Sequence, residues 1–231
     1  MKYTFILFLF FFLYGCSTNK KTDLQQDPIV TAYFNKNEIK QLDQVLSFFD
    51  DEVRLLSNTS SPLENSYQVF FKIESDSAWA GDPYGPILKI PAKKLNNLFS
   101  SISENLKNKL WVTSHYISPM TKDSVTDFNI RSDGKYEAFL QSSANENQTL
   151  ANYYKTFKQG HGITPALIAG FVMHANKLDL QRQSQRLIVA IHYIAIRETG
   201  QLRWEAFEKS RKKVASSGRM RTGAASDSVK N

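Results

Sequence analysis

The sequence predicts an α+β fold, with a small, mostly antiparallel sheet, an N-terminal amphipathic helix and a helical C-terminal half. Three observations predict this class. Apolar residues recur every three or four positions over residues 39–56, short alternating or clustered apolar runs follow between residues 67 and 141, and the helical period returns after about residue 147. No internal repeat is present, so we expect one domain over residues 28–213, with a candidate subdivision at residues 143–148.

The first predicted helix has the clearest pattern in the chain. Asn35 is followed three residues later by Glu38, the spacing of a capping box at a helix start. Its apolar positions are separated by three or four residues and form one face: Ile39, Leu42, Leu46, Phe49, Val53 and Leu56.

The middle of the chain is expected to supply the sheet and a second helix. Strands are predicted at residues 67–73, 87–90, 110–117, 125–131 and 136–141. Pro91 suits the first turn of a helix that continues to about Leu106. Asp133-Gly134 predicts a hairpin turn between the last two strands, because Asp-Gly accepts the positive φ that such turns need.

The last third of the chain is predicted to be helical. One helix contains residues 150–157 and ends at Gly160-His161-Gly162, and Thr164-Pro165 begins the next. Residues 186–196 are nearly all apolar and predict a central buried helix. Gly200 is expected to separate it from a final amphipathic helix at residues 202–212.

Charge is distributed unevenly along the chain. The formal net charge is +7, yet residues 16–208 hold 21 basic and 21 acidic side chains. This neutral body gives no electrostatic reason to expect nucleic-acid binding. Residues 209–231 hold seven Lys and Arg against one Asp. We expect a basic disordered tail at residues 214–231, for which anionic lipid headgroups are a candidate partner.

The N-terminus has the pattern of an export signal. Residues 5–14 form an apolar run of ten, which is too short to cross a bilayer but typical of a signal peptide. Leu13-Tyr14-Gly15-Cys16 then resembles the lipobox of bacterial lipoproteins. The resemblance implies cleavage before Cys16 and its acylation, for example with palmitate, giving a signal peptide over residues 1–15 and a polar tether over 16–27. Ser17 in place of an acidic residue implies the outer membrane of the cell envelope.

Motifs for catalysis are largely missing from the sequence. It has no Gly-x-Ser-x-Gly, His-Glu-x-x-His, phosphate-binding glycine loop or Cys-x-x-Cys, and the lone cysteine excludes an internal disulfide. No metal or cofactor is therefore predicted. His192, within an apolar run, is expected to be a hydrogen-bonded core residue. Asp50, Asp51 and Glu52 are interpreted as a solvated charge run rather than a cation site.

Three residues are candidates for ligand binding. Trp79 and Tyr84 lie in a segment of turn-forming residues, where their rings could contact a sugar or peptide, although packing of Trp79 over the core is the commoner arrangement. His161 lies between two glycines, which suits either ligand access or a simple tight connection. These features favour a non-catalytic lipoprotein that binds a protein, peptide or glycan. The alternatives are a hydrolase of envelope polymers using His161 with a carboxylate, and a toxin-immunity lipoprotein.

Overall fold

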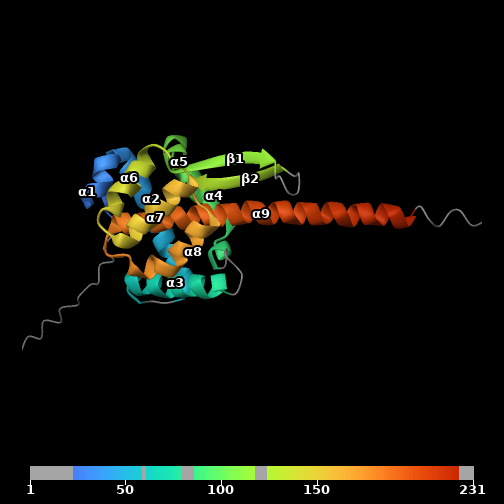
Figure 1. The fold of residues 1–231 in the computed structure, drawn as a ribbon, viewed down its shortest axis with the longest axis horizontal. Helices are drawn as coiled ribbons and strands as arrows, with labels where there is room; N and C mark the ends of the chain where they lie inside the picture. Colours follow the sequence, from blue (N-terminus) through green and yellow to red (C-terminus); the bar gives the residue numbers. More distant parts are fainter. Residues whose placement is uncertain (1–22, 59–60, 80–85, 118–123, 224–231) are drawn as a thin grey trace, which may run out of the picture.

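Helices make up most of the protein, and the strands found among the described residues form one two-stranded antiparallel sheet (Figure 1). The computed structural model describes residues 23–58, 61–79, 86–117 and 124–223. Its elements, in chain order, are η1 (Leu24–Gln26), α1 (Pro28–Tyr33), α2 (Lys36–Ser57), α3 (Leu63–Trp79), η2 (Pro86–Lys89), α4 (Ala92–Ser101), α5 (Glu104–Leu110), β1 (Trp111–Ile117), β2 (Ser124–Ile130), α6 (Lys135–Ala144), α7 (Gln148–Gly160), α8 (Pro165–His174), η3 (Ala175–Lys177) and α9 (Gln183–Gly223).

Helix α2 begins with the capping box that the sequence predicts. The side-chain oxygen of Asn35 accepts the Glu38 N–H at 3.0 Å, and the Glu38 carboxylate accepts the Asn35 N–H at 2.9 Å. These two bonds satisfy amides that the first turn of a helix leaves without partners. The predicted apolar face is buried from Ile39 to Val53, so this helix forms one wall of the core.

The first half of α9 runs through the centre of the core, as the sequence predicts. Residues 187–196 are each at most 2% exposed. The ring of Tyr193 lies 6.0 Å from that of Phe49 in α2, 4.9 Å from Phe70 in α3 and 6.0 Å from Phe171 in α8, measured between ring centroids. Buried residues from both sides of segment 143–148 belong to one hydrophobic cluster.

The strand predicted at residues 67–73 is wrong, because this segment belongs to helix α3. Its buried residues are Tyr67, Phe70, Phe71 and Glu74, a spacing that places them on one helical face, whereas Val69 is 38% exposed. Apolar residues occupy both the alternating and the helical positions of this run. The sequence pattern therefore fits either period, and packing against α2 decides in favour of the helix.

The two other strand predictions that fail involve short apolar runs beside turn residues. Residues 87–90 belong to the 3₁₀ turn η2 and its end, with Ile87 and Ile90 both buried. Residues 136–141 lie in helix α6, which buries Tyr136, Phe139 and Leu140. Gly134 does have a positive φ of 83°, but it precedes a helix instead of turning a hairpin.

Two helix boundaries also differ from the prediction. The helix expected after Pro91 is divided into α4 and α5, because the Ser103 side chain accepts the Leu106 N–H at 3.3 Å and starts a new helix. Gly200 does not end a helix, since α9 continues from Gln183 to Gly223. The backbone is thus helical for ten residues beyond the predicted start of the tail at residue 214.

Several predictions fall on residues that the structure does not describe. The signal peptide, Cys16 and most of the tether lie within residues 1–22, Tyr84 lies within residues 80–85, and the end of the chain lies within residues 224–231. Within the described part of the chain, no helix combines the length and the hydrophobicity needed to cross a bilayer.

Candidate functional site

The β1–β2 hairpin is fastened to α9 at its base. Trp111 pairs with Ile130 in the strand register, and the Trp111 indole N–H donates to the carbonyl of Ile191 in α9 at 3.2 Å. Further along, the Thr199 hydroxyl of α9 donates to the carbonyl of Phe128 in β2. An isolated two-stranded hairpin is marginally stable in water, so this attachment holds the sheet in place.

A cavity opens where β2, the start of α8, α9 and the end of α3 meet. Its volume is about 220 Å³. We call it the β2–α9 cavity, and it is lined by Ala78, Asp127, Phe128, Asn129, Ile163, Thr164, Pro165, Ile168, Ala169, Ile196, Thr199 and Arg203. Most of these residues are apolar, and the polar ones come from three separate segments, namely β2, the start of α8 and α9. Such a wall with a few convergent polar groups is typical of binding sites, although this cavity is smaller than the roughly 300–1,000 Å³ of common small-molecule sites.

An ion pair forms one side of the cavity. Arg203 of α9 contacts one carboxylate oxygen of Asp127 in β2 through Nη2 at 3.1 Å and Nε at 3.3 Å. The hydroxyl of Tyr116 donates to the other oxygen at 3.1 Å. Desolvation, and then this hydrogen bond to the carboxylate, raise the pKa of Tyr116 above its ordinary value. The phenol is therefore a neutral donor, and the cavity rim carries paired charges.

Asn129, two residues after Asp127 in β2, joins this strand to the turn before α8. Its side-chain oxygen accepts the Ile163 N–H at 2.7 Å, and its amide donates to the Ile163 carbonyl at 3.4 Å. Gly162, at φ 130°, has to be glycine here, because a Cβ would lie 2.7 Å from the Asn129 side-chain oxygen. The second glycine of Gly160-His161-Gly162 thus positions the turn against β2.

His161 ends α7 in a left-handed conformation, and its backbone N–H donates to the carbonyl of Phe157. Its side chain is exposed and makes no hydrogen bond or ion pair with any described residue. The hydrolase alternative required a carboxylate within hydrogen-bonding reach of this ring. Among the described residues, the structure provides no such partner, and the turn serves as a connection between α7 and α8.

Trp79 is the last residue of α3 rather than part of a loop, and its side chain is 78% exposed. The expectation that it packs over the core is therefore wrong. Trp79 and His161 do not line a common site, but each is close in sequence to the β2–α9 cavity. Ala78, next to Trp79, lines it, as does Ile163, two residues after His161.

The prediction for His192 is confirmed. Its ring is completely buried and shares a hydrogen bond of 3.0 Å with the Tyr153 hydroxyl. Burial lowers the pKa of His192 to about 3, so the ring is neutral at physiological pH. It packs edge-to-face or tilted against the rings of Tyr153, Phe171 and Tyr193, as a core residue does.

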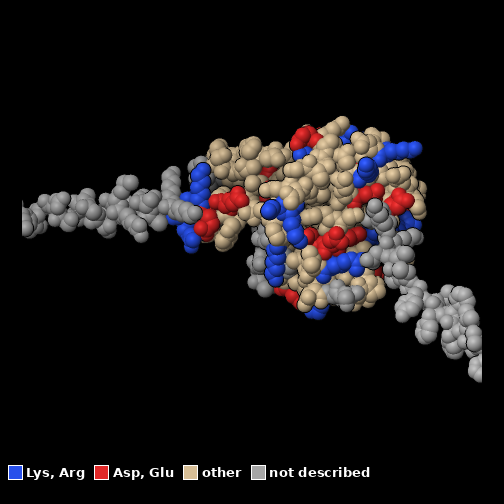
Figure 2. Space-filling view, turned by 180° about the vertical axis from the view of Figure 1, so that it is seen from behind, with Lys and Arg blue, Asp and Glu red and all other residues tan. Residues whose placement is uncertain are grey.

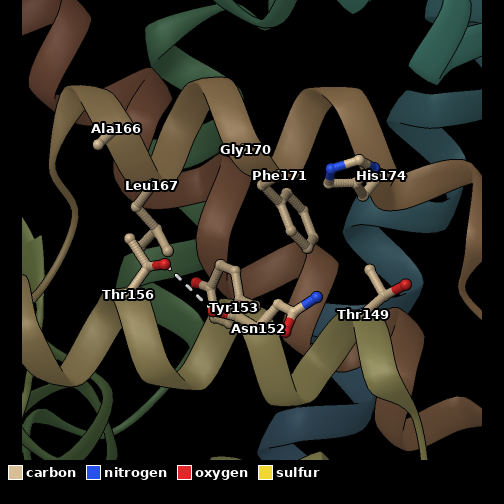
Figure 3. A pocket seen from close by; sticks show the side chains of 9 residues that line it. All are labelled: Thr149, Asn152, Tyr153, Thr156, Ala166, Leu167, Gly170, Phe171 and His174. Atoms are coloured by element: carbon tan, nitrogen blue, oxygen red, sulfur yellow. Dashed lines mark hydrogen bonds between the residues drawn. The ribbon is translucent and has the colours of Figure 1, made fainter.

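A second, smaller cavity of about 170 Å³ lies between α7 and α8 (Figure 3). His174 stands at one end of it, and Thr156 and Ala166 stand at the other. The Thr156 hydroxyl donates to the carbonyl of Asn152 within its own helix at 3.1 Å, so that donor already has a partner. This cavity is bounded by two helices only, and we consider the β2–α9 cavity the better candidate.

The prediction of a solvated acidic run in α2 holds for Asp51, which is exposed, but is wrong for its two neighbours. Asp50 and Glu52 are buried, at 6% and 5% exposure. Asp50 accepts a hydrogen bond from the Tyr67 hydroxyl at 2.7 Å and lies 3.4 Å from Arg186 of α9, while Glu52 pairs with Lys94 of α4 at 2.5 Å. These carboxylates therefore join α2 to its neighbours.

Sequence patterns did not identify the residues of the cavity as a group. Asp127 and Arg203 are 76 positions apart, and Asn129 contacts a residue 34 positions away. Alternation in residues 125–131 predicts the strand but not which surface it meets. The one local signal is the pair of glycines around His161, because Gly162 marks a turn that the Asn129 side chain approaches closely.

Comparisons with known proteins give no match to this chain, whether with family models, with curated proteins or with solved structures. Among the described residues, no three His, Cys, Asp or Glu side chains come together in a way that could hold a metal ion.

Proposed function

We propose that this protein is a non-catalytic binding module of the bacterial cell envelope, anchored in the outer membrane by acylation of Cys16. Its binding site is the β2–α9 cavity, and its partner is a protein or peptide that inserts an apolar side chain there. The observation that carries this proposal is an open, mostly apolar cavity where β2, α3, α8 and α9 meet, with an ion pair at its rim.

The dimensions of the cavity favour a side chain as the inserted group. A volume of about 220 Å³ suits one aliphatic or aromatic side chain better than a cofactor. Phe128, Ile163 and Ile168 supply apolar contact, whereas a sugar ring would need several hydrogen-bond partners in their place. Anchoring by one buried side chain, surrounded by a polar rim, is the common arrangement at protein interfaces.

The exposed indole of Trp79 extends this site. It follows Ala78, which lines the cavity, and exposed tryptophans are enriched where proteins bind one another. This retains the role predicted for Trp79, while His161 is left as a turn residue. A peptide bound here would bury one of its own side chains in the cavity and cover the indole ring of Trp79.

The binding site is tested by closing the cavity. Ala169 lines it on α8, and Ala169→Phe places a ring over the space. In a selection from a random peptide library displayed on phage, we expect enriched sequences with a shared aliphatic or aromatic residue. Their affinity should fall by about tenfold or more for Ala169→Phe and for Trp79→Ala. Ala32→Phe, a matched change at an exposed alanine of α1, should bind as the wild type does. Equal binding by Ala169→Phe and wild type would refute the cavity as the site.

The anchor is tested separately by mass spectrometry of the protein purified from native membranes. We expect a mature chain that begins at Cys16 and carries acyl chains, and a Cys16→Ser chain that is released from the membrane. Recovery of an unmodified Cys16, in protein that needs no detergent to dissolve, would remove the anchor from the proposal.

A further inference from the structure

The second half of α9 continues beyond the hydrophobic core. Gly200 does not interrupt the helix, which projects from the body past the β1–β2 hairpin and towards Gly223 (Figure 1). We call residues 203–223 the α9 extension. A helix that leaves the core loses the packing that stabilises most protein helices, so its surface composition becomes informative.

Two large aromatic side chains lie exposed at the start of the α9 extension. Trp204 is 58% exposed and Phe207 is 57% exposed, and their ring centroids are 5.9 Å apart. Residues three positions apart share a face of a helix, so the two rings form one apolar patch on the same side. Tryptophan and phenylalanine on a polar helix are characteristic of helices that lie in the interfacial region of a membrane.

The charge of the α9 extension has one dominant sign. It contains seven Lys and Arg and two Glu, a net charge of +5, whereas residues 16–208 are neutral overall. Lys209 and Arg211, which follow the aromatic pair, are both exposed. On the face of the body seen in Figure 2, acidic and basic side chains are instead intermixed.

The exposed aromatic pair and the positive charge beside it together indicate what kind of partner covers Trp204 and Phe207. A second copy would bring two extensions of the same charge together, which Coulomb repulsion opposes. An anionic bilayer supplies both negative headgroups for the basic residues and an apolar boundary for the rings. We propose that the α9 extension binds the surface of anionic phospholipid membranes, with Trp204 and Phe207 inserted at the headgroup boundary and Lys209 and Arg211 contacting the headgroups.

The proposal has a geometric consequence for an anchored chain. The first described elements, η1 and α1, lie at the end of the molecule opposite to the free end of α9 (Figure 1). The seven residue-to-residue steps from Cys16 to Asp23 can span at most about 25 Å. An anchor and an α9 extension that contact the same membrane would therefore hold the long axis of the molecule along the membrane plane.

The test uses the chain from residue 16 onwards with Cys16→Ser, so that no acyl group contributes and every described residue is kept. Binding is measured by co-flotation with phosphatidylcholine vesicles in which about one-third of the lipid is phosphatidylglycerol, and with pure phosphatidylcholine vesicles. We expect binding to the anionic vesicles that weakens with added salt, and at least about tenfold weaker binding to the neutral ones.

Two double variants separate the contributions of charge and of the rings. Lys209→Glu/Arg211→Glu should weaken binding to anionic vesicles by about tenfold or more, because each basic residue near such a surface contributes up to about fivefold. Trp204→Ser/Phe207→Ser should weaken it about tenfold while leaving the charge unchanged. Lys40→Glu/Lys155→Glu makes the same change of net charge at exposed positions of α2 and α7 and should bind within about twofold of the wild type.

Circular dichroism of each variant shows whether the helix is retained, so a loss of binding can be assigned to the side chains. Three results would overturn the proposal: equal binding to neutral and anionic vesicles, unchanged binding by both double variants, or a dimer in sedimentation that Trp204→Ser/Phe207→Ser dissociates. The last result would assign the patch to a second copy. Because the tested chain has no acyl group and an intact β2–α9 cavity, failure here leaves the proposed function unaffected.

Discussion

Residues 187–196 of α9 are each at most 2% exposed, whereas Trp204 and Phe207, about two turns further along the same helix, are 58% and 57% exposed. Both parts contain large apolar side chains. In the first part those side chains meet α2, α3 and α8, and in the second they meet each other and solvent. The comparison teaches that apolar content alone does not locate the core. The apolar residues of the first half stabilise the fold, and those of the second half are available to a partner.

The largest effect on stability is expected in the buried half of α9, at its centre. Tyr193→Ala removes a ring that contacts Phe49, Phe70 and Phe171. We expect the free energy of unfolding to fall by about 3–5 kcal/mol, because a buried aromatic side chain is replaced by a cavity. Chemical denaturation measures this loss. A decrease below about 1 kcal/mol would show that this part of α9 is not packed as described.

The buried His192 of the same core should make the stability of the protein depend on pH. Its pKa is about 3 in the folded protein and about 6.5 when unfolded, so on acidification the unfolded chain takes up a proton that the folded ring does not. The stabilisation is complete above pH 6.5 and is lost as the pH falls towards 3. Between about pH 6.5 and 4.5 the loss should be about 2–3 kcal/mol.

The control for this prediction compares slopes rather than absolute stabilities. His192→Gln should unfold with a shallower dependence on pH over this range, whereas His115→Gln, at an exposed histidine of β1, should keep the dependence of the wild type. Identical slopes for His192→Gln and wild type would show that His192 titrates normally in the folded protein.

A smaller effect is expected beside the β2–α9 cavity. Gly162→Ala forces an unfavourable φ of 130° on an alanine and brings its Cβ to 2.7 Å from the Asn129 side chain. We expect a loss of about 1–3 kcal/mol in stability. Gly170→Ala in α8 is the matched control, because a Cβ there meets nothing within 4 Å. It should leave stability unchanged or raise it by up to about 1 kcal/mol, since alanine favours a helix. The reverse order of the two variants would contradict the described turn.

The smallest effect on stability is expected in the exposed half of α9. Phe207→Ala should change the free energy of unfolding by no more than about 0.5 kcal/mol, as is usual for surface positions. Thermal unfolding of this variant beside Tyr193→Ala measures the contrast directly. A loss of 2 kcal/mol or more at Phe207 would mean that the ring is packed within the folded protein and is not available to a membrane.

Periodicity predicted those elements whose apolar residues fit one pattern only. Asn35 and Glu38 mark the start of α2 by a local interaction, and residues 186–196 are too continuously apolar to be exposed. Residues 67–73 fit both a strand and a helix, and only contact with α2 settles the choice. The Asp-Gly pair correctly predicts a positive φ at Gly134. A glycine with positive φ can precede a helix as well as turn a hairpin, and here it precedes α6. Local chemistry was correctly interpreted in these cases, while long-range packing decided the element.

The candidate site was much less predictable, for the same physical reason. The β2–α9 cavity exists because β2, α8 and α9 meet in space, and its ion pair joins Asp127 to a residue 76 positions later. The spacing of residues in a single sequence does not predict that these three elements pack against one another. Trp79 was identified because an aromatic residue among turn-forming residues is conspicuous, and its exposure is consistent with a binding role.

Amide hydrogen exchange of the acyl-free chain, with and without anionic vesicles, tests the division of α9 most directly. We predict strong protection of residues 187–196 in both conditions. Residues 204–211 should exchange much faster in the free protein and become protected when phosphatidylglycerol vesicles are added. Protection of residues 204–211 as strong as that of the core in the free protein, or no change on adding vesicles, would contradict the account.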